Sequence, residues 1–392
     1  MTTESPAERP AEVLTETPTE RRATWFELFG DLVFVAAVGQ VTHRIGEHPT
    51  GGAVAAATAL FVPLWWTWVL YAVRANRADR DNTAHRLLTM CGLAAVCGLA
   101  VFIGGVGHSP GADAGFVLSY LCARAGVAAL YAWESRTDTQ LAPLLRSFAM
   151  GSAGSAVLWA GGLAFAPGPL RYGAWAAGMA TDLLMPLLSG RRIARATHHV
   201  EHLRERFGLF TIIVLGEAVL GFTNGLIHAR TAPQAAVGAA AAFALCASLW
   251  WSYFSASGTR PGAHAQLARN PLLLHAYVFG HLPVQLGLAV TGGALSTAIA
   301  DPAGHMSLAS AACILGGVAL FLLATSAVRS AFTGLRDPVV AIRVTTALLA
   351  LALLPLGTRL PTPVLLAILA ALVAASVAAE TPGHRRRLAA TP

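Results

Sequence analysis

The chain lacks lysine altogether: all 27 of its Lys and Arg residues are arginine. It is also poor in charge, because charged side chains make up only 12% of its 392 residues and the mean hydropathy is +0.58. Such a composition argues against a soluble globular protein. The sequence further lacks a phosphate-binding loop, a Gly-rich dinucleotide fingerprint and a nucleophile elbow. We therefore expect neither an enzyme nor a nucleotide-driven pump, and we predict no cofactor.

Cysteine is scarce as well. All five cysteines fall within apolar runs, and their spacing indicates neither a disulfide framework nor a zinc site. The segment H-H-V-E-H at 198–202 does spell the H-x-x-E-H pattern of some zinc proteases, and His198 and His202 would share a helix face. It lies in the most arginine-rich loop and has no evident third ligand. An amphipathic helix on the membrane surface is therefore favoured, and no metal site is predicted.

Long apolar runs are what the sequence has in abundance. About twenty apolar residues cross a bilayer as a helix, and most of these runs reach that length. They are continuous rather than alternating, which favours helices over a membrane barrel. The run at 344–357 is short, and Pro355 and Pro361 bracket its end, so one hairpin could be lost without changing the parity of crossings. The twelve runs cover residues 25–45, 51–73, 87–107, 113–134, 147–166, 169–188, 208–229, 233–256, 272–300, 307–327, 344–357 and 361–380.

The arginines alternate between the gaps that separate these runs. The N-terminal tail, the even-numbered gaps and the C-terminal tail hold 22 of them. The odd-numbered gaps and the run ends beside them hold Arg44, Arg171, Arg230 and Arg359, and Arg124 alone lies well inside a run. Cytoplasmic loops of membrane proteins carry the arginine excess, so both termini are predicted to be cytoplasmic. The net charge of +7 is spread over many short loops, so we expect the lipid bilayer and not nucleic acid as the partner.

The chain repeats itself after six runs. The corresponding segments are L-F at 28–29 and 209–210, L-W-W-T-W at 64–68 and L-W-W-S-Y at 249–253, and L-L at 87–88 and 273–274. Their offsets of 181, 185 and 186 residues are nearly constant. Because six is even, the two halves would share an orientation, as in parallel-repeat transporters. Aromatic belts at the membrane surface are the alternative explanation of the tryptophan pairs.

The predicted fold is therefore all-α and integral to the membrane, with about 12 transmembrane helices as two parallel six-helix repeats. The N-terminal segment is rich in Pro, Thr and Glu and is expected to be disordered. The predicted segments are a cytoplasmic N-terminal tail at 1–24, a first repeat at 25–188, an amphipathic cytoplasmic linker at 189–207, a second repeat at 208–380 and a basic cytoplasmic C-terminal tail at 381–392.

A few acidic side chains lie inside the apolar runs. Of the 20 acidic residues, only Glu27, Asp31, Asp182 and Glu217 lie well within the runs. An ionisable group in hydrocarbon is costly, so by default it faces the bundle interior and marks a functional site. Glu27 and Asp31 are four residues apart and share a helix face. Arg124 must find a partner among these carboxylates, and we predict that it supports them electrostatically together with Arg206.

Further polar residues extend this candidate path. Asn224 and His228 follow Glu217 at spacings of seven and four residues and share its stripe, and His281 and Gln285 share a face of the ninth run. One interpretation is a route for a proton or another cation, because burial moves a carboxylate pKa toward neutrality. The other is a buried structural network in which arginine neutralises one carboxylate and the backbone satisfies the rest. The surplus of acids over cations slightly favours the route.

Two stretches resemble a known family. The segment W-F-E-L-F-G-D-L-V-F-V at 25–35 resembles the signature E-L-F-F-D-L-V-F-V of the low temperature requirement protein A family. The segment E-R-F-G-L-F-T-I-I-V-L-G-E at 205–217 is similar to that family's E-R-F-G-L-F-x-I-I-x-L-G-E run. Gly30 departs from the first signature but leaves Glu27 and Asp31 in place. The resemblance covers nearly the whole chain and implies a multi-pass protein of the bacterial inner membrane, linked by name to growth in the cold, without a settled biochemical activity.

These observations predict a membrane protein that moves a small ion or solute. Asp31 and Glu217 would be its principal carboxylates, with Asp182 and Arg124 as electrostatic support. The alternative is a non-transporting membrane sensor or assembly component linked to cold adaptation. A membrane enzyme acting on lipid would need a nucleophile or a metal, and neither is evident. The oligomeric state, including a homo-oligomer, stays open.

Overall fold

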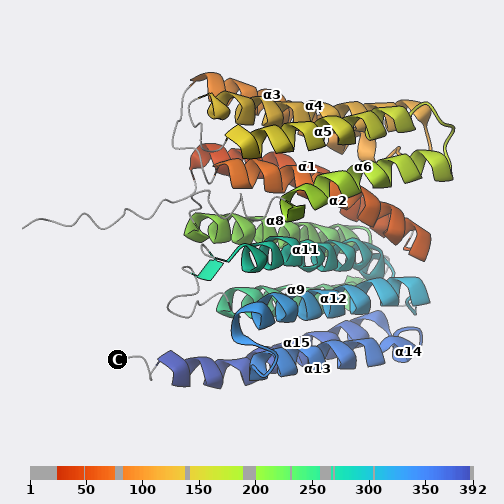
Figure 1. The fold of residues 1–392 in the computed structure, drawn as a ribbon. Coiled ribbons are helices and arrows are strands. Elements are labelled where there is room, and N and C mark those ends of the chain that lie inside the picture. The colour runs from red at the N-terminus through yellow and green to blue at the C-terminus, as the bar shows by residue number, and fades with distance from the viewer. Residues whose placement is uncertain are drawn as a thin grey trace, which may run out of the picture.

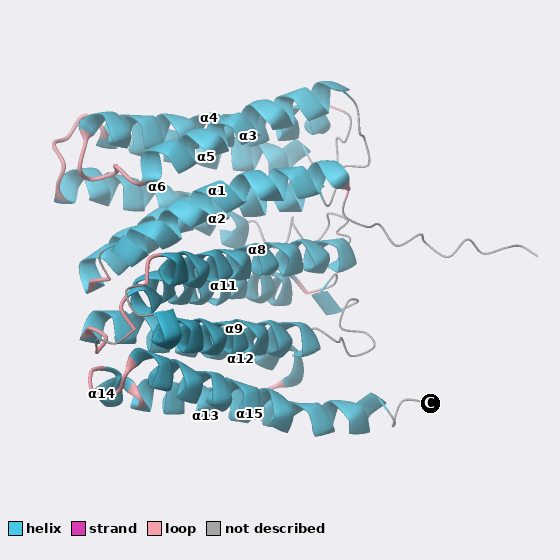
Figure 2. Cartoon of the chain, turned by 180° about the vertical axis from the view of Figure 1, so that it is seen from behind, coloured by secondary structure: helices cyan, strands magenta, loops and turns pink. Residues whose placement is uncertain are grey.

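The computed structural model describes residues 24–47, 49–75, 83–136, 142–188, 200–229, 232–256, 266–267, 270–302 and 305–388. Within these ranges the chain is helical, apart from loops and an isolated antiparallel bridge between His305 and Pro361. The long helices run side by side in one stack (Figure 1), and Figure 2 shows the same stack from behind, with loops confined to the helix ends. The helices are α1 (Trp25–Glu47), α2 (Gly51–Ala75), α3 (Thr83–Ile103), α4 (Pro110–Ser135), α5 (Ala142–Gly162), α6 (Pro169–Leu188), α8 (Val200–Ile227), α9 (Ala232–Ala256), α11 (Pro271–Ala300), α12 (Leu308–Thr333), α13 (Pro338–Ala352), α14 (Leu354–Gly357) and α15 (Thr362–Leu388).

Nine of the described helices are long and apolar enough to cross a membrane: α1, α2, α3, α4, α8, α9, α11, α12 and α15. The prediction of an all-helical membrane protein is thereby confirmed. The short run predicted at 344–357 overlaps α13, which has only 15 residues, and the single turn of α14. Pro355 accounts for the break between them, because a proline ring clashes with the carbonyl group of the preceding turn and ends a helix.

Several helices begin with a cap that is legible in the sequence. Ser109, Asn270 and Asp337 each accept a hydrogen bond from a backbone N–H of the first turn, and a proline follows each of them. At the start of α1, Thr24 and Glu27 bond each other's backbone N–H groups at 3.2 and 3.3 Å, which is a capping box. These local signals fix where the helices enter the stack.

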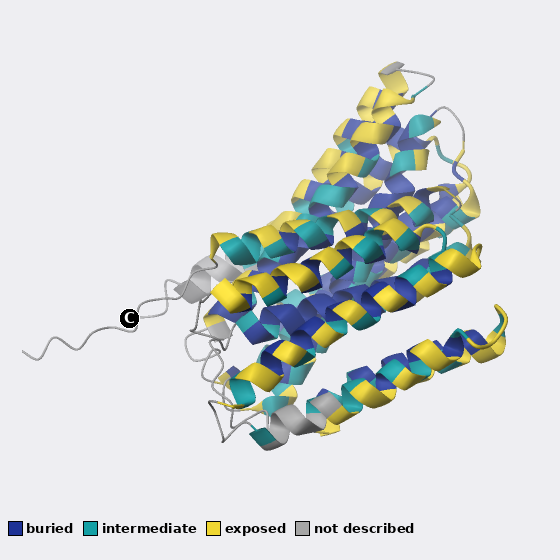
Figure 3. Ribbon diagram, turned by 90° about the horizontal axis from the view of Figure 1, so that it is seen from above, coloured by how far each residue is buried: buried dark blue, intermediate teal, exposed yellow. Residues whose placement is uncertain are grey.

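The two halves of the chain meet along a central group of helices. In Figure 1, α3, α4 and α5 lie at one side of the stack and α13, α14 and α15 at the other. Between them, α1 packs on both α8 and α11, and α2 also touches α11. Figure 3 shows buried residues along the inner helix faces and exposed residues along the outer ones. The most buried of the membrane-length helices are α11, α12 and α2, and α1 and α8 complete the junction between the two halves.

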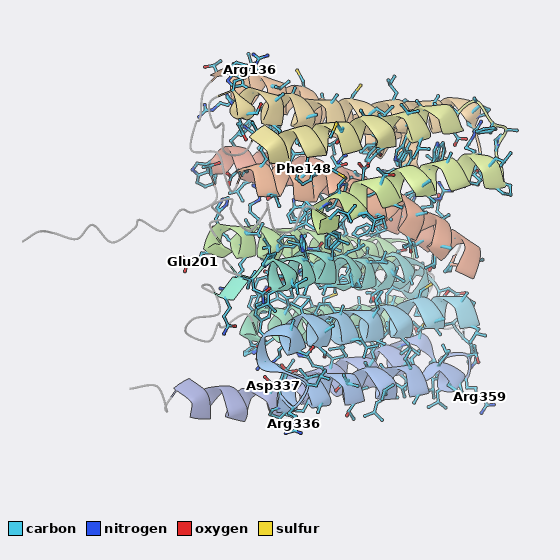
Figure 4. The ribbon with its side chains drawn as sticks, in the orientation of Figure 1. Arg136, Phe148, Glu201, Arg336, Asp337 and Arg359 are labelled. Carbon is cyan, nitrogen blue, oxygen red and sulfur yellow. The ribbon has the colours of Figure 1, made fainter. Side chains whose placement is uncertain are left out.

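Ion pairs and hydrogen bonds join helix ends that lie at the same end of the stack. At one side, Arg74 at the end of α2 pairs with Glu134 at the end of α4, with Nε and Oε1 3.0 Å apart. At the opposite side, Arg44 at the end of α1 donates to the carbonyl oxygen of Ile103 at 2.8 Å. Figure 4 shows Arg136 and Glu201 at one end of the stack and Arg359 at the other. Successive helices therefore alternate in direction, as the distribution of arginines predicts.

The structure differs from two predicted segment boundaries. Of the predicted surface linker at 189–207, residues 189–199 lie outside the described residues, while 200–207 form the first two turns of α8. His202 and Arg206 in these turns are buried, so this part does not lie on the membrane surface. At the other end, α15 continues to Leu388, beyond the start of the predicted tail at 381–392. The N-terminal tail at 1–24 falls outside the described residues except for Thr24.

Candidate functional site

Buried charge is concentrated where α1 and α2 meet α8. This central cluster consists of Glu27, Asp31, Trp68, His202 and Arg206. The Arg206 guanidinium donates from Nη2 to Asp31 Oδ1 at 2.7 Å, and its Nη1 lies 3.5 Å from Glu27 Oε2. His202 bonds the same Glu27 oxygen through Nε2 at 2.9 Å. Asp31, His202 and Arg206 are each between 1% and 3% exposed, so the cluster brings opposite charges into the interior.

The spacing along the two helices explains this arrangement. Glu27 and Asp31 lie four residues apart on α1, and His202 and Arg206 lie four residues apart on α8. Residues at this spacing project from one helix face, so the packing of α1 on α8 sets two acids opposite two basic groups. The prediction that Glu27 and Asp31 share a face is confirmed by their common partner, Arg206.

Hydrogen bonding in the central cluster is incomplete. Asp31 Oδ1 accepts from both Arg206 Nη2 and Trp68 Nε1, the latter at 2.8 Å. The other oxygen, Asp31 Oδ2, is buried without a partner in the described structure, and so are Arg206 Nε and, by hydrogen-bond geometry, Nη1. Buried polar groups in proteins are nearly always paired with protein or ordered water. The described structure therefore leaves one buried acceptor and two buried donor atoms of the central cluster unpaired.

Aromatic packing holds the Trp68 indole in place. Its ring stacks on Phe210 with centroids 4.2 Å apart and meets the edge of Phe207 at 5.0 Å. Both phenylalanines belong to α8, which also carries Arg206. The contact therefore fixes the indole N–H and the guanidinium on the same carboxylate, and it links the second helix of the first half to the first helix of the second half.

A neutral polar layer lies next to this cluster, between α2, α8, α9 and α11. Gln285 is fully buried; its Oε1 accepts from Trp65 Nε1 at 2.6 Å, and its Nε2 donates to Thr211 at 3.4 Å. His281, one turn earlier on α11, bonds the Tyr253 hydroxyl through Nε2 at 3.0 Å and a backbone carbonyl through Nδ1 at 2.6 Å. Gln285 and His281 thus share a helix region but bind different partners.

Glu217 lies near the middle of α8 and differs from the other intramembrane acids. It is half-buried, and it forms no ion pair within the described residues. Its carboxylate lies over Gly39 of α1, where an added Cβ would come within 2.8 Å of Oε2. The nearby Thr42 hydroxyl donates to the Gly39 carbonyl oxygen at 2.8 Å. At the next residue, Ala218, α8 meets α11 equally closely, because a Cβ on Gly292 would lie 2.8 Å from Ala218 Cα. Glu217 is therefore held at a tight junction of α1, α8 and α11.

The remaining residues of the predicted stripe on α8 are not in the interior. Asn224 and His228 are exposed, and the His228 ring bonds the Asn224 carbonyl oxygen at 2.9 Å. They lie at the far end of the helix from the central cluster. The structure therefore does not bring them together with Glu27 or Asp31.

Asp182 lies apart from these residues, in a second cluster within the first half. This peripheral cluster consists of Tyr120 and Arg124 on α4, Ser152 and Ser155 on α5, and Asp182 on α6. Asp182 Oδ1 pairs with Arg124, while Oδ2 accepts from Tyr120 at 2.8 Å and from Ser155 at 2.7 Å. Arg124 also donates to Ser152 at 2.8 Å. The prediction that Arg124 finds a carboxylate partner is confirmed, and both oxygens of that partner are satisfied.

Sequence reasoning missed several of the groups that complete these clusters. Trp65 and Trp68 were interpreted only as a repeat landmark or an aromatic belt, whereas both donate hydrogen bonds to buried polar side chains. Their spacing of three residues places them on one helix face and was the available signal. A further buried pair, Arg343 with Glu380, joins α13 to α15 at 2.8 Å. Its arginine had been assigned to a cytoplasmic gap on charge alone.

The zinc interpretation receives no support from the described residues. No group of three His, Cys, Asp or Glu side chains within them is arranged to hold a metal ion. His198 and His199 lie outside the described part of the chain, and His202 is directed to Glu27.

These features define a multi-pass α-helical membrane protein with buried arginine–carboxylate clusters. The chain belongs to the bacterial low temperature requirement A protein family, whose model matches residues 22–378. It is similar to an uncharacterized protein of Rhizobium meliloti strain 1021, with 25% identity over 319 residues, which is 79% of this chain and 78% of the relative. No solved structure matches the chain significantly.

Proposed function

We propose that this protein moves a proton or another small cation across the bacterial inner membrane, along a polar column between α1, α8 and α11. The observation that carries the proposal is Glu217, a half-buried carboxylate near the middle of a membrane-length helix, without a cationic partner in the described structure. An ionisable group at such a depth is costly and is retained by default for function. Glu217 supplies a negative charge that only a mobile cation or proton would neutralise.

The column has three levels. Glu27 and Asp31 occupy its outer end, the Gln285–Thr211 pair lies next, and Glu217 lies deepest, over Gly39 of α1. On α1, Asp31 and Gly39 are eight residues apart, so the two carboxylate levels are separated by about 12 Å. This separation is too long for direct proton transfer between the acids, so an intermediate carrier such as water is required.

Apolar side chains close the space between these levels. Phe34, Val38 and Val214 lie between Asp31 and Glu217 along α1 and α8, and each is at most 1% exposed. A permanently open, water-filled pore is inconsistent with such packing. The arrangement favours a gated carrier, in which the helices separate transiently to connect the two carboxylates.

The test is flux in proteoliposomes that contain a pH-sensitive dye, under an imposed membrane potential. Glu217→Gln and Asp31→Asn should reduce proton flux to the level of empty liposomes, because each variant removes a titratable charge and keeps the size of the side chain. Glu47→Gln is the matched control, since Glu47 lies exposed at the end of α1. The same liposomes with Na⁺ and K⁺ gradients identify the cation. Wild-type flux in both variants would refute the assignment.

We further propose that the chain crosses the membrane 12 times as two parallel repeats, with both termini in the cytoplasm. Packing supports this: α1 contacts α2 and α3 as α8 contacts α9 and α11, and α3–α4–α5–α6 pack in sequence as α11–α12–α13–α15 do. Reporter fusions at each terminus test the orientation. A periplasmic signal at either end would contradict it.

A non-transporting role is the second candidate, and the peripheral cluster favours it. Asp182 is fully paired by Arg124, Tyr120 and Ser155, as expected of a buried scaffold. If wild-type protein carries no H⁺, Na⁺ or K⁺ while both clusters are needed for stability, this role replaces transport.

A further inference from the structure

Glu217 lies at the edge of the junction of α1, α8 and α11, where the buried side of α8 meets its outer side. It is ten residues from the end of α8, about 15 Å along the axis, which is about half of a hydrocarbon core of about 30 Å. Val214, toward the junction, is fully buried, whereas Leu220 is 60% exposed and Ile213 is half-buried. Both of the latter lie one turn from Glu217. Exposed apolar side chains of a membrane helix face lipid, so the Glu217 carboxyl group borders hydrocarbon.

On α1, no cationic side chain of the described structure faces this carboxyl group. Its two oxygens lie over Gly39, 2.8 and 3.4 Å from the position of an added Cβ. The nearest basic residues of the helix are His43 and Arg44, about one turn further on. His43 is exposed, with Nε2 3.3 Å from Glu47 Oε1, and Arg44 donates to a carbonyl oxygen at the end of α3. Asp31, about 12 Å away along α1, has its own arginine.

The helices α2, α9 and α11, which also pack on α8, bring no charge to this level. α9 has no charged residue. The titratable group that its antiparallel packing on α8 places nearest is Cys246, a buried thiol that behaves as a small apolar side chain. On α11, His281 lies about 15 Å along the helix from this level. The only charged residue of α2, Arg74, is in its last turn and pairs with α4.

The site also lacks a set of ligands for an alkali-metal ion. Sites for K⁺ and Na⁺ in membrane proteins gather several oxygens, including carbonyl oxygens of filter loops or unwound helices. Here α1, α8 and α11 each pass through this level as one helix, so their carbonyl groups are engaged in helix hydrogen bonds. The Thr42 hydroxyl donates to the Gly39 carbonyl oxygen, and no three His, Cys, Asp or Glu side chains of the described residues are placed to hold a metal ion. A proton, by contrast, needs only the carboxylate itself.

We propose that Glu217 carries a proton in this structure, as a neutral carboxylic acid at the lipid boundary, and that the cation moved by the protein is H⁺ and not Na⁺ or K⁺. An unpaired charge in an apolar environment is so costly that the group is neutralised instead, and no side chain of the described residues is placed to neutralise this one. The second part of the proposal rests on the proposed transport function, whereas the first part does not.

The experiment treats wild-type protein in liposomes with dicyclohexylcarbodiimide, an apolar reagent that enters the bilayer and reacts with protonated carboxyl groups. The acid proton moves to one reagent nitrogen while the carboxyl oxygen bonds the central carbon. The acyl group then shifts to the other nitrogen, giving a stable acylurea from which no atom is lost. Peptide mass spectrometry should find the adduct on Glu217 and not on Asp31 or Asp182, which are each 2% exposed and paired with arginine.

Two further measurements identify the bound species. Labelling of Glu217 should fall about tenfold per pH unit once the proton is lost at alkaline pH, and it should be the same in Na⁺, K⁺ and choline buffers of equal pH. Glu217→Gln should remove the adduct, and Glu47→Gln is the matched control that should keep it, because Glu47 is exposed at the end of α1.

Two results would overturn the protonated state: no adduct on Glu217 in wild-type protein, or labelling that Na⁺ or K⁺ suppresses at constant pH, since a metal ion would then occupy the carboxylate. Flux of Na⁺ or K⁺ without H⁺ would overturn the choice of substrate. Absence of all flux from protein that still shows pH-dependent labelling would refute transport and uphold the protonated state, so the two failures are distinguishable.

Discussion

Asp182 in the peripheral cluster and Asp31 in the central cluster are both buried, and each pairs with an arginine, but their other hydrogen bonds differ. Asp182 distributes its hydrogen bonds over both oxygens, with Arg124 on one and Tyr120 and Ser155 on the other. Asp31 directs both of its bonds to a single oxygen and leaves the second without a partner in the described structure. The first cluster lies within one half of the chain, and the second lies where the two halves meet.

This difference suggests that the peripheral cluster is a rigid scaffold and that the central cluster is able to change its hydrogen bonds. A fully satisfied buried network resists rearrangement, because any movement leaves a polar group unpaired. In the central cluster, Arg206 already lies between two carboxylates, 2.7 Å from Asp31 and 3.5 Å from Glu27. It can shift from one to the other without losing its charge compensation. The central cluster is therefore the one suited to a cycle of proton binding and release.

The largest expected effect comes from breaking the satisfied cluster. Arg124→Leu leaves Asp182 buried without its counter-ion, and removal of one partner of a buried pair costs about 3–5 kcal/mol. The thermal unfolding midpoint in detergent should fall accordingly. The double variant Arg124→Leu/Asp182→Leu should regain most of the loss, because an apolar replacement removes the unpaired charge. A double variant as unstable as the single one would contradict the pairing.

Replacement of each aspartate by asparagine compares the clusters directly. The amide nitrogen cannot accept, so Asp182→Asn must lose bonds at one oxygen whichever way it turns. Asp31→Asn can place its nitrogen where Oδ2 has no partner and keep both bonds at the oxygen. We expect Asp182→Asn to be about 2 kcal/mol less stable than Asp31→Asn, as measured by chemical unfolding followed by tryptophan fluorescence. Equal losses of stability in the two variants would show that the unpaired Oδ2 of Asp31 does not affect the stability of the protein.

A smaller change tests whether the column depends on the tight junction at Glu217. Gly39→Ala adds a Cβ within 2.8 Å of Glu217 Oε2 and must displace the carboxylate. Flux should fall several-fold while stability changes by no more than about 1 kcal/mol, since alanine favours the helix. Gly30→Ala is the control, because its Cβ would make only ordinary contact with Leu93 at 3.7 Å. Unchanged flux in Gly39→Ala would remove Glu217 from the path.

The smallest effect concerns Asp337, which lies between α12 and α13, outside the membrane-length helices, and pairs with Arg329 in the last turns of α12. Burial alone would raise the pKa of Asp337, but the Val339 backbone N–H and the Arg329 guanidinium outweigh burial and lower that pKa below its ordinary 3.8. A lowered folded-state pKa contributes stability above the unfolded value, and this contribution disappears as the pH falls through the folded value. Stability should therefore decline below about pH 4, and Asp337→Asn should decline less. If stability depended on pH in the same way in wild type and in Asp337→Asn, Asp337 would not be the source of the decline.

Local patterns in the sequence predicted some features and missed others. Helix lengths and the shared face of Glu27 and Asp31 were predicted, because both follow from neighbours within a few turns. The tryptophan motifs show the limit of such patterns. Trp65 and Trp66 are at most 3% exposed, whereas Trp250 and Trp251 at the corresponding positions are 46% and 55% exposed. Both motifs contain the same Trp-Trp pair, but α2 packs against α1, α4 and α11, whereas α9 leaves the face with its tryptophans exposed.

By itself, the sequence determined that this protein is a bundle of membrane helices. Hydropathy over about twenty residues and the placement of arginine are local features, which do not depend on contacts between residues far apart in the chain. Tertiary structure alone decided which buried acids are paired. Asp31 and Arg206 are 175 residues apart, and no helical periodicity extends across that distance. Only the packing of α1 on α8 gives Asp31 its arginine, and only the separate packing of α4, α5 and α6 satisfies Asp182, while Glu217 is left without a counter-charge in the described structure.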